Sequence, residues 1–326
     1  MYTVGGLFSG VGGIELGFEQ AGFKIEWSNE IDKHCIETFK NNHKHKIFSE
    51  SITDLDFKKI KPVDILVGGF PCQAFSVAGY RKGFKDERGN LFFQICRAID
   101  ELKKKPRVLM LENVKNLTGH DKGKTAKVIV NSLRELGYSV FWNIFNTSVY
   151  TDIPQNRERT FIICFRDEKD WDFDLKKNSM SSKFNSYLPL KKSNKKKHIK
   201  EMLEKIDIDE KYYYKQNFYA FNEIKNSIKS KDTVYQWRRV YVRENKSGEC
   251  PTLTANMGTG GHNVPLILDD IGIRKLTPKE CLNFQGYPKN FSFPDNVPNS
   301  QRYKQAGNSV TVKLIKKVAE IIKLSL

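Results

Sequence analysis

The sequence predicts an α/β fold, in which helices cover a parallel sheet, followed by a smaller and irregular second domain. Over the first 170 residues, short β-branched or apolar runs alternate with stretches of helical pattern, which is typical of βαβ units. The composition then changes to a region rich in Lys, Asn and Tyr that ends in the glycine cluster MGTGGHN at 257–263. A last amphipathic stretch, at 310–324, has the pattern of a helix that packs one face on a core.

Each element of the first domain is expected where an apolar run or a helical pattern stands. Strands are expected at 2–8, 24–28, 63–68, 108–112, 140–145 and 161–165. Helices are expected between them, at 13–21, 33–41, 91–104 and 124–136. Near the C-terminus, LTPKECLNFQG carries the capping signal of a helix start, and the final helix places Val312, Ile315, Val318 and Ile322 near one face.

Size and composition exclude several classes of protein. A chain of 326 residues can bury a large core, and a hydrophobic share of 39% with 29% charged residues is typical of a globular protein. No run approaches the roughly 18 apolar residues of a membrane span. The start, MYTVGGLFSGVGG, lacks the basic region of a signal peptide, so we expect a cytoplasmic location. The six cysteines are widely spaced, which predicts reduced thiols and neither a disulfide framework nor a metal site.

The charge predicts a polyanionic partner. The formal net charge is +17, and the segment 176–231 holds 15 Lys, no Arg and six acidic residues, which is more than half of the excess. The alternative is a solvated, Lys-rich surface without a specific partner. The same segment contains many aromatic residues, which a flexible linker would lack.

The first candidate site combines a glycine turn with an acid. FSGVGG, at 8–13, follows a strand and opens a helix, so its backbone can approach a ligand. Glu30 stands about 20 residues further on, at the end of the next strand, where a carboxylate can accept both hydroxyls of a ribose. The alternative is a tight turn beside a surface acid. The spacing differs from the pyrophosphate-binding GxGxxG, which argues against a nicotinamide dehydrogenase and favours adenosine without a pyrophosphate.

The second candidate site is a cysteine in a loop. GGFPCQAFS, at 68–76, places Cys72 just beyond a strand, in a loop stiffened by Pro71. Structural cysteines are normally buried within elements, so this position favours a nucleophile over a packing role. The loop stays polar as far as Leu91, which is long enough for a lid.

Two further motifs carry charged side chains at the ends of predicted strands. Glu112 and Asn113 end a central strand, where a carboxyl can contact a bound base; the alternatives are a helix N-cap or a surface acid. Arg157 and Arg159, in IPQNRERTF, stand two apart before a strand, so alternation points both to one face. Two guanidinium groups on one face suit a phosphate and a carbonyl oxygen.

These motifs resemble those of the DNA (cytosine-5) methyltransferases of bacterial restriction-modification systems. FSGVGG, GGFPCQAFS, ENV, QNRER, LTPKECLNFQGYP and QAGNSV occur in the order and spacing of that family, over the whole chain except about 170–248. The resemblance implies a Rossmann-like S-adenosylmethionine-dependent methyltransferase domain at 1–172 and 300–326, with the last helix packed onto it. It also implies a smaller, irregular target-recognition domain at 173–299.

The resemblance also implies the chemistry and the residues that perform it. The Cys72 thiolate would add to carbon 6 of a cytosine flipped out of double-stranded DNA, so that carbon 5 can accept a methyl group from S-adenosyl-L-methionine. Glu112 would donate a proton to ring nitrogen 3, Arg159 would hold the carbonyl oxygen, and Arg157 would contact a phosphate. The implied cofactor contacts are Phe8, Gly10, Val11, Gly12, Glu30, Ile31, Ser51, Ile52, Pro71, Leu91, Asn308 and Val310. The implied DNA contacts are Gln73, Ser76, Arg88, Thr252, Leu253, Gly258 and Gly260.

The chain departs from the family at two positions, and other functions stay open. Ser51 stands where the family commonly has an acid for the adenine amine, and Asn283 stands where an arginine is frequent. Methylation of cytosine in RNA and a catalytically idle DNA-binding homologue are the alternatives; the basic segment opposes the first, and the intact Cys72, Glu112, Arg157 and Arg159 oppose the second. We expect a monomer, with a restriction endonuclease acting separately. The recognised bases do not follow from the sequence.

Overall fold

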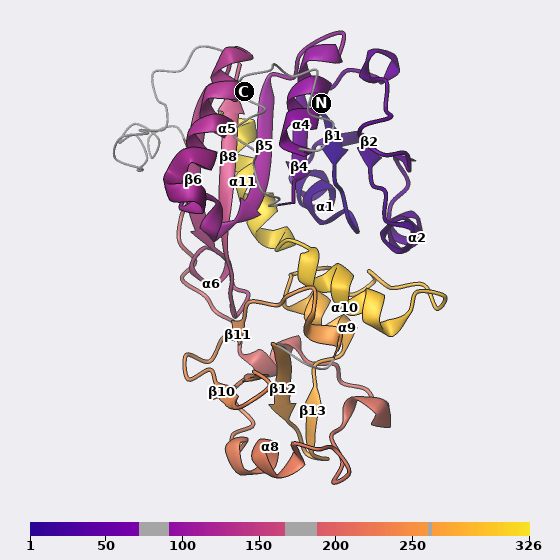
Figure 1. The fold of residues 1–326 in the computed structure, drawn as a ribbon, viewed down its shortest axis with the longest axis vertical. Helices are drawn as coiled ribbons and strands as arrows, with labels where there is room; N and C mark the ends of the chain where they lie inside the picture. The colour runs from indigo at the N-terminus through magenta and orange to yellow at the C-terminus, as the bar shows by residue number, and fades with distance from the viewer. Residues whose placement is uncertain (72–90, 167–187, 260–262) are drawn as a thin grey trace.

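A computed structural model of the chain describes residues 1–71, 91–166, 188–259 and 263–326. The molecule is elongated: a seven-stranded sheet with helices on both faces forms one end, and a four-stranded sheet forms the other (Figure 1). The helices α9 (Pro278–Asn283) and α10 (Asn299–Asn308) lie between the two sheets (Figure 1). No helix in the described ranges is long and apolar enough to cross a membrane.

The large sheet has the strand order β3-β2-β1-β4-β5-β8-β6. These strands are β1 (Thr3–Leu7), β2 (Lys24–Asn29), β3 (Lys46–Phe48), β4 (Ile65–Gly69), β5 (Val108–Val114), β6 (Ser139–Asn146) and β8 (Glu158–Phe165). Every predicted strand is present, while β3 was not predicted. The expectation of a parallel sheet is wrong for β8, which runs antiparallel to both β5 and β6. The connection from β6 to β8 is too short for the crossover that a parallel neighbour requires, so β8 turns back.

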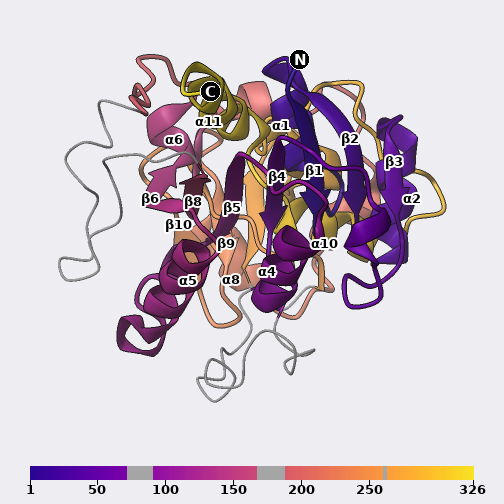
Figure 2. The same ribbon diagram turned by 90° about the horizontal axis from the view of Figure 1, so that it is seen from above.

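Helices cover both faces of this sheet, as predicted. They are α1 (Gly13–Gln20), α2 (Lys33–Asn42), α4 (Leu91–Glu101), α5 (Lys124–Glu135) and α11 (Val312–Leu324). Figure 2 shows α4 and α5 on one face, and α1 and α11 on the other. The last helix therefore returns to the first domain: Val318 and Ile322 of α11 share an apolar core with Phe18 of α1. A Cβ added to Gly17 would lie 2.5 Å from Cγ2 of Ile315, so this glycine lets the two helices approach closely.

The small sheet is antiparallel and has the order β10-β9-β12-β13. Its strands are β9 (Tyr235–Trp237), β10 (Val242–Glu244), β12 (Val264–Leu268) and β13 (Ile273–Lys275), with α8 (Phe221–Ser227) packed on the same core. The predicted helix start at Thr277 is confirmed, because Thr277 and Glu280 form a reciprocal capping box at the start of α9. A short parallel pair, β7 (Gln155–Asn156) with β11 (Cys250–Pro251), joins the two parts after α6 (Thr147–Tyr150).

Two segments near the predicted domain limits contact residues that are distant in sequence. Leu188 is buried in the core beneath α11, and Ser193 donates a backbone hydrogen bond to Val149, so the chain near 190 still lies on the first domain. Conversely, Tyr303 and Ala306 of α10 are buried in a core with Leu253. These segments are held by contacts with residues distant in sequence, and the limits at 172 and 300 stay predictions.

Candidate functional site

A cavity of about 540 Å³ opens at the carboxyl edge of the large sheet. The turn after β1, the ends of β2, β4, β5 and β8, and the segment between α10 and α11 enclose it. This volume lies within the roughly 300–1,000 Å³ that small-molecule sites occupy. Of the residues that the sequence assigned to a cofactor pocket, nine line it: Phe8, Gly10, Val11, Glu30, Ile31, Pro71, Leu91, Asn308 and Val310.

The turn after β1 is shaped by backbone torsions that favour glycine. Gly10 and Gly12 have φ angles of 56° and 83°, in the left-handed region. Gly10 donates its N–H to Oε2 of Glu30 at 2.7 Å, and the N–H groups of Ile31 and Asp32 donate to Oε1, both at 2.8 Å. The Glu30 carboxylate is thus held in one orientation on the wall of the cavity.

Three predicted cofactor contacts do not line the cavity. A Cβ on Gly12 would lie 2.2 Å from Nε2 of His43, so this glycine faces the protein interior. Ile52 is 4% exposed and packs in the core under α4, while the Ser51 hydroxyl is 2.7 Å from that of Thr53. Ser51 and Ile52 are thus not among the residues that line this cavity, and their contact with a cofactor stays a prediction.

Glu112 is a buried carboxyl at the end of β5, beside the cavity. It is 8% exposed, and Nε of Arg159 lies 3.2 Å from its Oε1. No described residue makes a hydrogen bond to that oxygen. Burial raises the pKa of Glu112, and the guanidinium groups of Arg159 and Arg157 only partly oppose this effect. A buried carboxyl that lines a cavity and has a raised pKa can donate a proton to a bound ligand.

Asn113, at the end of β5, holds the segment that follows β4. Its side-chain amide donates to the carbonyl of Phe70 at 2.8 Å, which ties the end of β5 to the residue before Pro71. Pro71 lines the cavity and is the last described residue before Cys72 in the chain. Cys72, Gln73, Ser76, Arg88 and Gly260 lie outside the described residues.

Arg157 borders the same cavity as Arg159, as the alternation predicted, but its contacts differ from the expectation. It is 2% exposed, and its two terminal nitrogens donate to the backbone carbonyls of Leu253, Gly307 and Ser309. A phosphate contact is therefore not supported, because these N–H groups already donate hydrogen bonds to backbone carbonyls. Arg157 instead connects three segments that surround the cavity.

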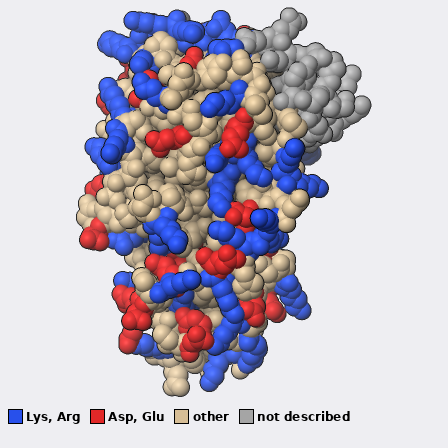
Figure 3. Space-filling view, turned by 180° about the vertical axis from the view of Figure 1, so that it is seen from behind, with Lys and Arg blue, Asp and Glu red and all other residues tan. Residues whose placement is uncertain are grey.

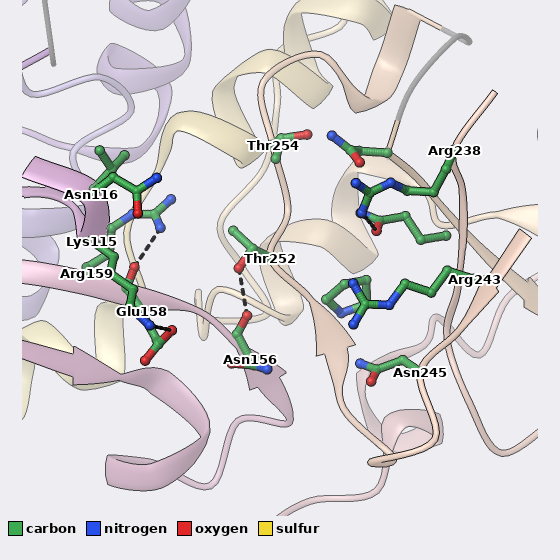
Figure 4. Close-up of a pocket in the computed structure, with 14 residues that line it drawn as sticks. Lys115, Asn116, Asn156, Glu158, Arg159, Arg238, Arg243, Asn245, Thr252 and Thr254 are labelled. Atoms are coloured by element: carbon green, nitrogen blue, oxygen red, sulfur yellow. Dashed lines mark hydrogen bonds and ion pairs between the residues drawn. The ribbon is translucent and has the colours of Figure 1, made fainter. Parts of the chain in front are cut away.

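A second cavity, of about 430 Å³, lies between the two sheets. Figure 4 shows its two walls: Lys115, Asn116, Glu158 and Arg159 belong to the first domain, and Arg238, Arg243 and Asn245 belong to the second. Val114 and Arg159 line both cavities, so the two adjoin beside Glu112. A ligand in the second cavity would therefore reach the first at Arg159.

Three predicted DNA contacts of the second domain are among the described residues, and one of them, Thr252, lines this cavity. Thr252 donates a hydrogen bond to the carbonyl of Asn156. Leu253 is 2% exposed within a core, and a Cβ on Gly258 would lie 2.5 Å from Cβ of Tyr303. Leu253 and Gly258 therefore pack against the protein itself in this structure, and their contact with DNA stays a prediction.

Sequence reasoning missed Gln236, Arg238, Arg243 and Asn245. A signal was present in YQWRR, where the aromatic Tyr235 and Trp237 alternate with polar residues as in a strand with one buried face.

Six of the 12 described lysines of the segment 176–231 form ion pairs with acids. Lys200 and Lys231 lie 2.6 Å from Asp232 and Asp270, and Lys196 pairs with Glu249. On the face of the molecule in Figure 3, basic and acidic side chains are interspersed along its whole length. In the described part of the chain, this segment is therefore not a continuous basic surface.

Comparisons with known proteins show which sequences and structures the chain is similar to. A model of the family "C-5 cytosine-specific DNA methylase" matches residues 2–324. The chain is 48% identical to the Type II methyltransferase M.Bsp6I of Bacillus sp. (strain RFL6), covering 99% of this chain and 98% of that protein. It is 37% identical to the Type II methyltransferase M.HhaI of Haemophilus parahaemolyticus, covering 98% and 94%. Among solved structures, a DNMT2 of Spodoptera frugiperda has a TM-score of 0.75 at 20% identity, over 99% of this chain and 100% of that chain, which supports the fold.

Proposed function

Because this chain belongs to the C-5 cytosine-specific DNA methylase family, it methylates carbon 5 of cytosine in DNA, and we propose that S-adenosylmethionine is its methyl donor. We further propose that it acts as a monomer on a short specific sequence of double-stranded DNA, and that a separate restriction endonuclease cuts the same sequence. The observation that carries the proposal is the buried Glu112 carboxyl, which lines the first cavity beside the point where the two cavities adjoin.

The first cavity suits an adenosine group. The carboxylate of Glu30 is oriented by three backbone N–H groups and keeps acceptor capacity for the two hydroxyls of a ribose. Ile31 is 65% exposed on the cavity wall, and an adenine ring placed against it would cover this apolar surface. When bound, S-adenosylmethionine supplies an electrophilic methyl group.

We assign the nucleophile to Cys72. Its thiolate forms a bond to carbon 6 of the cytosine, and the electrons of the carbon 5–carbon 6 double bond move toward carbon 5. Glu112 donates its proton to ring nitrogen 3, which neutralises the charge that develops on the ring. Once carbon 5 carries the methyl group, the carbon 5 proton passes to water. Ring nitrogen 3 returns its proton to Glu112 as the sulfur–carbon 6 bond breaks, which restores the ring double bonds, the carboxyl and the thiolate.

We assign recognition of the carbonyl oxygen of the cytosine to Arg159. Its Nε is engaged with Glu112, and its side chain borders both cavities. A stacked base cannot reach buried side chains of this kind, so the cytosine must leave the duplex, as methyltransferases of nucleic acids generally require. Arg157 acts as a positioning residue, because it holds the backbone around this site rather than the base.

Bisulfite sequencing of DNA from cells that express the chain tests the proposal. We expect methylated cytosine at one short sequence motif, and no such mark in cells that express the Cys72→Ser variant. DNA that carries 5-fluorocytosine should become covalently attached to the wild type in the presence of S-adenosylmethionine. Methylation that persists in the serine variant, or that is confined to RNA, would contradict the assignment.

A further inference from the structure

The β9–β10 hairpin presents one polar face to the second cavity. Arg243 is directly opposite Gln236 in the antiparallel register, so both side chains point to the same side of the sheet. Tyr235 and Trp237, the neighbours of Gln236, are 1% and 2% exposed and pack in the core on the other side. Arg238 follows at the next position on the polar face, and its N–H donates to the carbonyl of Tyr241, which continues the ladder.

The two arginines of this face carry charge that no described acid neutralises. Nη1 of Arg238 donates to Oε1 of Gln236 at 3.0 Å, and none of the ion pairs between described residues includes Arg238 or Arg243. On the opposite wall, Glu158 is already paired with Lys115 at 2.6 Å. Figure 4 shows both arginines extending across the cavity toward Thr252 and Asn156. The cavity thus offers a ligand two guanidinium groups that have no ion-pair partner among the described residues.

A two-stranded β-ribbon of this size fits the major groove of B-form DNA. Gln236 is only 6% exposed, so it holds the guanidinium of Arg238 in one orientation. Fixed orientation is useful for reading a base edge, whereas a contact to phosphate needs only charge. An arginine side chain most often reads guanine, through a bidentate contact to O6 and N7.

We propose that the β9–β10 hairpin reads the bases beside the target cytosine, with Arg238 and Arg243 each contacting a guanine and Gln236 orienting Arg238. This inference rests on the proposed function, since it assumes that duplex DNA lies between the two sheets. The two cavities meet at Arg159, so the hairpin faces bases adjacent to the one that is flipped out.

A pool of duplexes randomised around one cytosine tests the inference, with bisulfite sequencing of the products after limited reaction. We expect Arg238→Ala and Arg243→Ala each to reduce discrimination for guanine at one position by about 10- to 100-fold, while cytosine is still methylated and other positions keep their preference. Gln236→Ala should weaken the same position as Arg238→Ala, by a smaller factor. Lys246→Ala is the matched control: this exposed residue follows the hairpin and does not line the cavity, so the sequence preference should stay unchanged.

The outcomes separate this inference from the proposed function. If the wild type methylates a specific motif but both arginine variants keep its preference, the hairpin does not read bases. The same holds if each variant loses rate by an equal factor on every duplex, because that is the behaviour of a phosphate contact. If the wild type methylates no cytosine in DNA, the proposed function itself is contradicted.

Discussion

Glu112 shows how burial prepares a single carboxyl for proton donation. Its pKa lies above the ordinary value near 4.5 because the side chain is removed from water. At a given pH the carboxyl is therefore protonated more often than an exposed glutamate. The acid that the cytosine ring needs is supplied by the surroundings of the residue as much as by its type.

We expect Glu112→Gln to slow the chemical step by roughly 100-fold or more, the range of general acid catalysis, with a smaller effect on the affinity for DNA. In the wild type, the rate should fall as the pH rises through the pKa of Glu112, since the carboxyl then loses the proton that it donates. The glutamine variant should lack this decline. Single-turnover kinetics across the pH range measure both effects, and an unchanged rate in the variant would refute the role of Glu112.

Glu15 on α1 is a second buried carboxyl, and we expect it to affect stability rather than catalysis. It is 1% exposed, and burial raises its pKa to about 7 from 4.5, although Ser28 donates a hydrogen bond to it. The folded protein therefore binds this proton more tightly than the unfolded chain does. The stabilisation that this proton provides is complete below a pH of about 4.5, and it is lost as the pH rises toward 7.

The variant Glu15→Gln should remove this pH dependence. Between pH 4.5 and 7, the free energy of unfolding of the wild type should fall by roughly 3 kcal/mol relative to that of the variant, as a shift of this size requires. Urea denaturation at a series of pH values measures the difference. Glu19→Gln, on the exposed side of the same helix, is the control and should behave as the wild type. Parallel curves for the wild type and Glu15→Gln would mean that Glu15 does not bind a proton on folding.

At the scale of elements, Arg157 joins distant segments of the chain beside the short β7–β11 pair, which also connects the two parts of the molecule. It precedes β8, and its partners are the carbonyls of Leu253, after β11, and of Gly307 and Ser309, at the end of α10. These bonds span 96, 150 and 152 residues of sequence. One buried side chain therefore helps to hold the second domain on the first, together with the β7–β11 pair.

We expect Arg157→Ala to lower the free energy of unfolding by about 3 kcal/mol or more, because each buried carbonyl left without a donor costs about 1–3 kcal/mol. Thermal denaturation should show a clear drop in Tm. Arg159→Ala serves as the comparison: its side chain is 16% exposed and makes one hydrogen bond to a neighbouring carbonyl, so stability should change less while activity is lost. Equal Tm values for the two variants would argue against a connecting role for Arg157.

At the scale of the whole molecule, the distribution of charge matters more than its total. The net charge of +17 predicts strong attraction to DNA and steep weakening by salt. However, the lysine run at 191–197 packs along the first domain, where Lys317 of α11 donates to the carbonyl of Lys191. None of Lys191, Lys192 and Lys195 lines either cavity between or beside the sheets.

We expect the triple variant Lys191→Gln, Lys192→Gln, Lys195→Gln to keep the salt dependence of DNA binding within about one unit of the wild-type slope, since about 0.9 units correspond to one phosphate contact. Affinity measured from 50 to 200 mM salt gives the slope. A decrease of two units or more would show that this run does follow the DNA backbone, as the sequence had indicated.

The sequence by itself determined most strands and helices of the first domain, the glycine turn with Glu30, and the placement of Glu112 at the carboxyl edge of the sheet. Such features depend on local patterns and on the rule that parallel strands end at the same edge. Only the tertiary structure decided the direction of β8, the burial of Ile52, Leu253 and Gly258, the partners of Arg157, and the hairpin face that carries Arg238 and Arg243. Each of these depends on which distant segments pack together, and the side-chain pattern of one segment does not specify the surface that covers it.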